Sequence, residues 1–133
     1  MLGSILKPYL LTLIPFVALD ALWLGLIAPQ FYRAQIGHLM TDQVNWPPAV
    51  LFYTLFIAGM VFFVTGATIR SGDMRQALLR GAIFGFITYA TYDLTNHATL
   101  RDWPLLMTVV DMAWGTTLGA ATALGATWLG RKI

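Results

Sequence analysis

Three aspartates, Asp20, Asp93 and Asp111, stand deep in apolar segments, away from any lysine or arginine. Each segment is long enough to cross a membrane, where an ionised carboxylate costs roughly 2.5–3.5 kcal/mol. A carboxylate kept at that cost can bind a cation, exchange protons, or act as a general acid or base. The three residues therefore indicate where the protein works, although they name neither a substrate nor a cofactor.

The three aspartates are expected to lie at one depth in the membrane. Asp20 comes eight residues before the end of segment 8–28, and Asp111 comes seven residues after Pro104. Asp93 lies a few residues before the end of segment 80–97. At a rise of about 1.5 Å per residue, each carboxylate lies about 6–12 Å below the outer boundary. We therefore predict a single shared site.

Polar and aromatic residues accompany the aspartates. Trp23 and Trp114 each follow an aspartate by three residues, which places an indole beside each carboxylate on a helix. Candidate hydrogen-bond donors near the acids are Tyr89, Tyr92, Thr95, Asn96 and His97. Arg101 would join this face if its helix continues, because it follows His97 by four residues. Such contacts would only tie helices together, and the alternatives are protonated carboxyl groups or a bound cation.

Asp93 and His97 also have the spacing of two ligands on one helix face. Together with Asp111 they could offer oxygen and imidazole ligands to a metal ion. The pattern is less specific than His-Glu-x-x-His, and a histidine hydrogen-bonded to Asp93 is the simpler interpretation. These three residues therefore stand only as metal candidates.

The composition predicts an all-α membrane protein. The chain has 133 residues, of which 58% are hydrophobic and 11% are charged, whereas about 25% of residues are charged in soluble domains. Segments of about 20 apolar residues can cross the roughly 30 Å of a bilayer, and four qualify: 8–28, 47–69, 80–97 and 104–128. We expect one integral membrane domain, residues 1–133, folded as a four-helix bundle.

The basic residues predict an orientation. Four spans place both termini on the side that carries Lys7, Arg70, Arg75, Arg80, Arg131 and Lys132, and leave Arg33 and Arg101 on the other. Positive residues favour the cytoplasmic side, so both termini are expected in the cytoplasm. The basic residues form no stripe with interleaved aromatics, which argues against nucleic-acid binding.

The first outer loop, residues 29–46, has its own pattern. Tyr32, Ile36, Leu39 and Met40 fall on one helical face, as in a short amphipathic helix that lies on the membrane surface. The alternative is a lid over the site below it.

Small residues recur at four-residue intervals in the last two segments. Gly81 and Gly85 form one pair, and Gly115 and Gly119 form another, which Ala123 extends. Such faces allow close helix packing in lipid. We expect the two faces to pack against each other, and the alternative is that one of them holds a second copy or a membrane protein partner.

Several strings of the sequence are distinctive. They are YATYDLTNHATL at 89–100, the Trp103-Pro104 pair, VDMAWG at 110–115 and DALWLG at 20–25. Together they resemble a family of small bacterial membrane proteins, domain of unknown function 2177. The resemblance implies four helices in the bacterial inner membrane and no settled activity.

Three functions remain open at this point. The first is a carrier or binder of a small ligand, cation or proton, with Asp93 and Asp111 as the primary groups and Asp20 as the third. The second is a membrane-embedded enzyme that acts on a lipid or apolar molecule, and the third is an accessory subunit or assembly factor. Ionisable residues gathered at one depth favour the first, because ion and proton pathways have this pattern.

Overall fold

The computed structural model describes residues 1–133 and is helical throughout, with no strand. Its first helical segment comprises α1 (Leu2–Leu22), the π turn η1 (Trp23–Ile27), α2 (Ala28–Ile36) and the 3-10 turn η2 (Gly37–Leu39). The second comprises α3 (Trp46–Met60), the π turn η3 (Val61–Thr65) and α4 (Gly66–Ser71). Two uninterrupted helices follow, α5 (Met74–Thr99) and α6 (Leu105–Gly130).

Each predicted span lies within one of these four helical segments, except that Pro104 immediately precedes α6. Two segments, Leu2–Leu39 and Trp46–Ser71, are long and apolar enough to cross a membrane. Helices α5 and α6 have 26 residues each, which at about 1.5 Å per residue also exceeds the roughly 30 Å of a hydrocarbon core. Helix α5 is less apolar because it carries ionisable and amide side chains, and glycine and threonine occupy many positions of α6.

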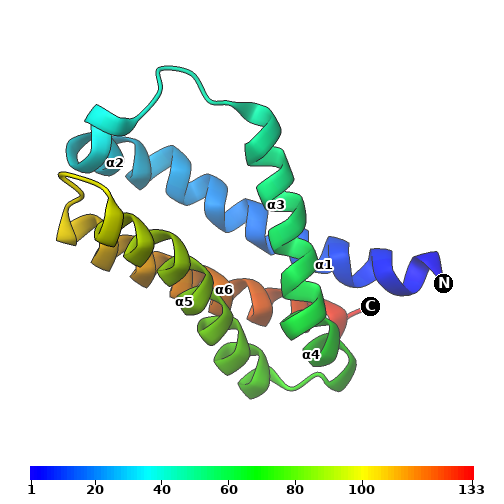
Figure 1. Ribbon diagram of the computed structural model, residues 1–133. Helices are drawn as coiled ribbons and strands as arrows, with labels where there is room; N and C mark the ends of the chain where they lie inside the picture. Colours follow the sequence, from blue (N-terminus) through cyan, green and yellow to red (C-terminus); the bar gives the residue numbers. More distant parts are fainter.

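The helices form a bundle that is tight on one side and open on the other (Figure 1). Helices α5 and α6 make the most extensive contact, and α1 runs along α6. Helix α3 packs against α1 and reaches α5 mainly through side chains, such as the Phe56 ring at 5.3 Å from the Phe84 ring. Its continuation η3 closes the bundle against α5. The bundle is therefore loosest between α3 and α5.

Glycines make the contact between α5 and α6. A Cβ at Gly85 would overlap the Gly115 carbonyl, and a Cβ at Gly81 would overlap the Gly119 carbonyl and the Ala123 side chain. The two small-residue faces thus pack against each other within the chain. A partner that used either face would have to displace the other helix.

The first segment differs from its prediction. The helix does not stop near Ala28, because the π turn η1 carries it directly into α2. Pro29 occupies the first turn of α2, where a missing backbone N–H is tolerated. The predicted amphipathic helix therefore exists as an extension of the first helix and not as a separate element.

The inner face of α2 covers one end of the bundle. Ile36 is buried with Trp103 and Met107, and Tyr32 packs against them. Leu39 and Met40, which were predicted on the same face, are exposed. Helix α2 thus lies beside the layer that contains the aspartates, and its Tyr32 reaches Asp111.

The opposite end gathers basic residues. The Lys7 ammonium group donates to the Ile133 carbonyl at 3.1 Å, and the Arg131 side chain lies against Gly72 in the turn between α4 and α5. The start of α1, this turn and the C-terminus consequently meet at one end of the bundle.

We expect Gly85→Ala to destabilise the fold by about 1–3 kcal/mol, because the added methyl group overpacks the α5–α6 contact. By helix propensity alone, replacing glycine with alanine would stabilise the helix by up to about 1 kcal/mol. A loss of stability in Gly85→Ala would therefore report overpacking. Thermal unfolding followed by circular dichroism in detergent measures it. Gly3→Ala is the control, because a Cβ at Gly3 meets nothing within 4 Å. Equal melting temperatures for the two variants would contradict the packing.

Candidate functional site

All three aspartates are buried, although they come from three helices. The residues are 7% (Asp20, on α1), 0% (Asp93, on α5) and 3% (Asp111, on α6) exposed. Asp111 lies close enough to interact electrostatically with both of the others. The structure thus brings the three aspartates together around Asp111.

Asp20 is held by an aromatic donor from α3. The Tyr53 hydroxyl donates to Oδ2 of Asp20 at 2.6 Å. The indole N–H of Trp114 lies beside the same carboxyl without reaching hydrogen-bond geometry. A buried carboxylate that accepts a hydrogen bond avoids part of its desolvation cost. The Tyr53 hydroxyl therefore orients the Asp20 carboxyl and replaces part of the hydration that this group loses on burial.

Asp111 is held by a chain of donors from the first segment. The Tyr32 hydroxyl donates to Oδ1 of Asp111 at 2.6 Å, and the Trp23 indole N–H donates to the Tyr32 hydroxyl at 3.0 Å. The Trp23 ring stacks on the Trp114 ring, with centroids 4.5 Å apart and planes 7° from parallel. Trp114 lies beside Asp20, and Trp23 reaches Asp111 through Tyr32. Each indole thus serves the aspartate of the other segment, and the stacked pair joins η1 to α6.

Asp93 has no donor at all. Both of its carboxyl oxygens are buried without a hydrogen-bond partner, and its neighbour is the Asp111 carboxyl. The predicted donor network around it is absent. The Thr95 hydroxyl bonds to backbone carbonyls of its own helix, and Asn96 lies nearer to the Tyr92 hydroxyl. Asp93 is thus the least satisfied polar group of the layer.

His97 and Arg101 do not take the positions expected for them beside Asp93. Nδ1 of His97 pairs with the Thr108 hydroxyl at 3.0 Å, which also accepts from the Trp103 indole at 3.0 Å. No three His, Asp or Glu side chains lie close enough together to hold a metal ion, so Asp93, His97 and Asp111 form no metal site here. Helix α5 ends at Thr99, and Arg101 is exposed beyond it.

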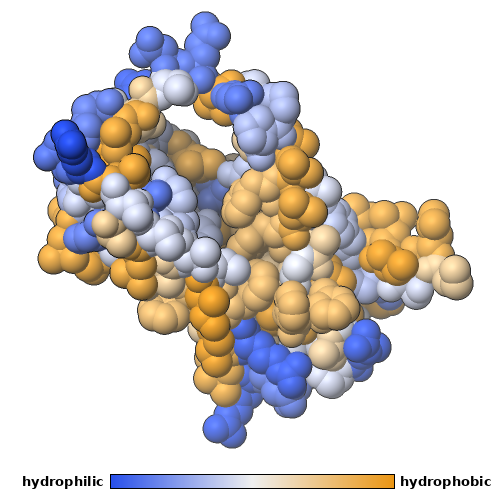
Figure 2. Space-filling view, viewed as in Figure 1, coloured by the Kyte–Doolittle hydropathy of each residue, from blue (hydrophilic) through white to orange (hydrophobic).

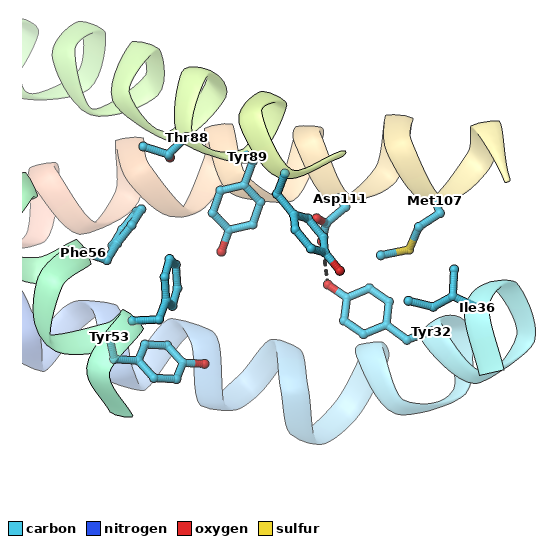
Figure 3. A pocket seen from close by; sticks show the side chains of 10 residues that line it. Tyr32, Ile36, Tyr53, Phe56, Thr88, Tyr89, Met107 and Asp111 are labelled. Atoms are coloured by element: carbon cyan, nitrogen blue, oxygen red, sulfur yellow. Dashed lines mark hydrogen bonds between the residues drawn. The ribbon is translucent and has the colours of Figure 1, made fainter. Parts of the chain in front are cut away.

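A cavity of about 460 Å³ adjoins the acidic layer. Its lining comes from α2, α3, α5 and α6 and consists of Tyr32, Ile36, Phe52, Tyr53, Phe56, Thr88, Tyr89, Tyr92, Met107 and Asp111. Figure 3 shows the Tyr89 and Tyr53 hydroxyls pointing toward the centre, while Tyr32 reaches Asp111 from the opposite helix. The cavity is therefore an aromatic chamber with one carboxylate in its wall.

The mouth of the cavity faces sideways. Figure 2 shows the surface hollowed between α3 and α5, below the loop that joins α2 to α3. Phe52 and Tyr92 line the cavity and remain about half exposed, at 51% and 50%. A molecule would enter across the helices and not along their axes.

Glycine also shapes this chamber. A Cβ at Gly115 would overlap the Tyr89 ring, so the missing side chain makes room for that ring over α6. Tyr89 is close enough to interact with all three aspartates and with Tyr53. The Gly115 position therefore serves both helix packing and the placement of an aromatic side chain at the centre of the site.

Sequence reasoning missed Tyr53 and assigned Tyr32 only to an interfacial helix. A usable signal existed for Tyr53, which lies seven residues after Trp46 at the start of α3, just as Asp111 lies seven residues after Pro104. Counting residues from the start of the helix, as for the aspartates, would therefore have placed the Tyr53 hydroxyl in the acidic layer.

A family model described as "Predicted membrane protein (DUF2177)" matches residues 5–128, which include the whole site. The chain belongs to this family. No curated protein and no solved structure matches it.

In this DUF2177 chain, Tyr32→Phe removes the only side-chain donor to Asp111. Leaving a buried acceptor without its donor costs about 1–3 kcal/mol, so we expect a lower melting temperature in detergent. Tyr9→Phe is the matched control, because the Tyr9 hydroxyl makes a longer bond of 3.3 Å to the Thr54 carbonyl at an exposed position. If Tyr9→Phe lowered the melting temperature as much as Tyr32→Phe, the result would argue against a special contribution of the Tyr32–Asp111 hydrogen bond.

Proposed function

We propose that this chain crosses the bacterial inner membrane four times, with both termini in the cytoplasm, and binds a small organic cation in the aromatic cavity. Lys7 and Arg131 lie at the same end of the bundle, close to the C-terminus and to the turn at Gly72. This supports the orientation, because positive residues favour the cytoplasmic side. The length of α5 and α6 supports the number of spans.

The observation that supports an organic cation most strongly is the chemistry of the cavity wall. Six aromatic rings surround it, from Tyr32, Phe52, Tyr53, Phe56, Tyr89 and Tyr92, with the Asp111 carboxyl among them. Aromatic faces attract desolvated cations by about 0.5–2 kcal/mol each, and the carboxylate supplies the opposite charge. Apolar walls with a few placed polar groups are typical of small-molecule sites, and the volume lies within their usual range.

An inorganic cation fits the cavity less well. Calcium takes six to eight oxygen ligands, and magnesium requires octahedral geometry, whereas only Asp111 among the acids lines the cavity. A monovalent ammonium group with an apolar body matches both the single carboxylate and the rings. The sideways mouth supports entry of such an amphiphilic molecule from the lipid.

Binding is compatible with carriage across the membrane, which would require the site to open to both sides in turn. A second candidate is a membrane-embedded enzyme that acts on a lipid or apolar small molecule, and the neighbouring Asp93 and Asp111 carboxyls favour it as an acid–base pair. An accessory or assembly role through the glycine faces has less support, because those faces are occupied within the chain.

Topology can be tested by single-cysteine labelling, because the chain contains no cysteine. In spheroplasts, we expect Asp42→Cys and Arg101→Cys to react with a membrane-impermeant maleimide, and Lys132→Cys to react only after permeabilisation. Arg101→Cys distinguishes four spans from two, since two spans would leave this position inside. Protection of Arg101→Cys in spheroplasts would refute the four-span arrangement.

Cation binding can be tested with phenyltrimethylammonium and its uncharged isostere tert-butylbenzene, by calorimetry on protein in nanodiscs. We expect the cation to bind and the isostere not to bind. Asp111→Asn should weaken cation binding at least about tenfold, or 1.4 kcal/mol, whereas Asp42→Asn, at an exposed loop position, should not. Equal affinity for the two compounds would show an apolar pocket without a cation site.

A further inference from the structure

Asp93 has no role in the proposed cation binding, although it is the least exposed of the three aspartates. Its neighbour is the Asp111 carboxyl, and it does not line the cavity. We infer that Asp93 and Asp111 share one proton, and that a bound cation displaces this proton, so that the site exchanges a proton for its ligand. This inference rests on the proposed cation binding.

The first reason is the geometry of the pair. The Asp93 carboxyl is fully buried beside the Asp111 carboxyl, and neither Asp93 oxygen has a hydrogen-bond partner. Two ionised carboxylates can only accept hydrogen bonds, so a bond between them requires a proton on one. Neighbouring carboxylates that share a site also repel, and one proton relieves that repulsion.

The second reason is the absence of a fixed positive charge around the pair. The titratable groups that face it are Asp20 from α1, Tyr32 from α2, and Tyr89 and Tyr92 from α5, and each of them is neutral or negative. Tyr53 from α3 is also uncharged and donates to Asp20. His97 is engaged with Thr108 one turn further along α5, and Arg101 is exposed beyond the helix end. A second negative charge would therefore have no neutralising partner until a cation arrives.

The exchange conserves charge. In the empty site the pair carries one proton and a net charge of −1. When a monovalent cation binds at Asp111, the carboxyl O–H bond breaks, its electron pair stays on the oxygen, and the proton leaves to water through Asp111, which lines the cavity. The two carboxylates and the cation again sum to −1. Constant net charge matters here because each additional charge in an apolar surrounding is costly.

The test is proton release on cation binding, measured with the full chain in nanodiscs. Calorimetry with phenyltrimethylammonium in two buffers of different ionisation enthalpy gives the number of protons released. By linkage, about one proton should leave per bound cation in the wild-type protein. Asp93→Asn should still bind the cation but release almost none, and Asp42→Asn should release as many protons as wild type.

The outcomes separate the two proposals. Failure of the wild-type protein to bind the cation would remove the proposed function, and binding without proton release would remove the exchange alone. Undiminished release from Asp93→Asn would assign the proton to another group and overturn the inference. If Asp93→Asn does not fold, infrared difference spectra of the wild type decide: the protonated-carboxyl band should disappear on cation binding, and its persistence would refute the exchange.

Discussion

The burial of three carboxyl groups among apolar helices is the constraint on which the rest of the structure depends. Each acid needs a hydrogen-bond donor or a proton, because burial removes most of the water that would otherwise solvate it. Asp20 and Asp111 obtain phenolic donors from α3 and α2. The Tyr32–Asp111 bond joins the first helical segment to α6, and the Tyr53–Asp20 bond joins α3 to α1. The α5–α6 pair is held by its glycine faces and by the His97–Thr108 bond.

Much of this arrangement was predictable from local features of the sequence. The four helical segments follow from apolar length, and the common depth of Asp20, Asp93 and Asp111 follows from counting residues to the helix ends. The spacing of Gly81 and Gly85 predicted a close helix contact, which the structure places against α6. These features depend on helical periodicity alone, so they needed no knowledge of how the helices are arranged.

The features that could not be predicted depend on neighbours from other helices. The shared face of Asp93 and His97 was correct as geometry, but Thr108 on α6 lies nearer to the imidazole and takes its hydrogen bond. The end of α5 at Thr99 removed Arg101 from that face. The π turn Trp23–Ile27 was also invisible to a pattern of 3.6 residues per turn, and it is the element that carries Tyr32 over Asp111.

The stacked pair of Trp23 and Trp114 has a spectroscopic consequence. Two indoles with centroids 4.5 Å apart and nearly parallel planes couple their electronic transitions and produce an exciton couplet in circular dichroism. The intensity and sign of such a couplet vary with the angle between the transition dipoles. One indole belongs to the first helical segment and the other to the last. The couplet therefore reports the relative rotation of these two segments without an added dye.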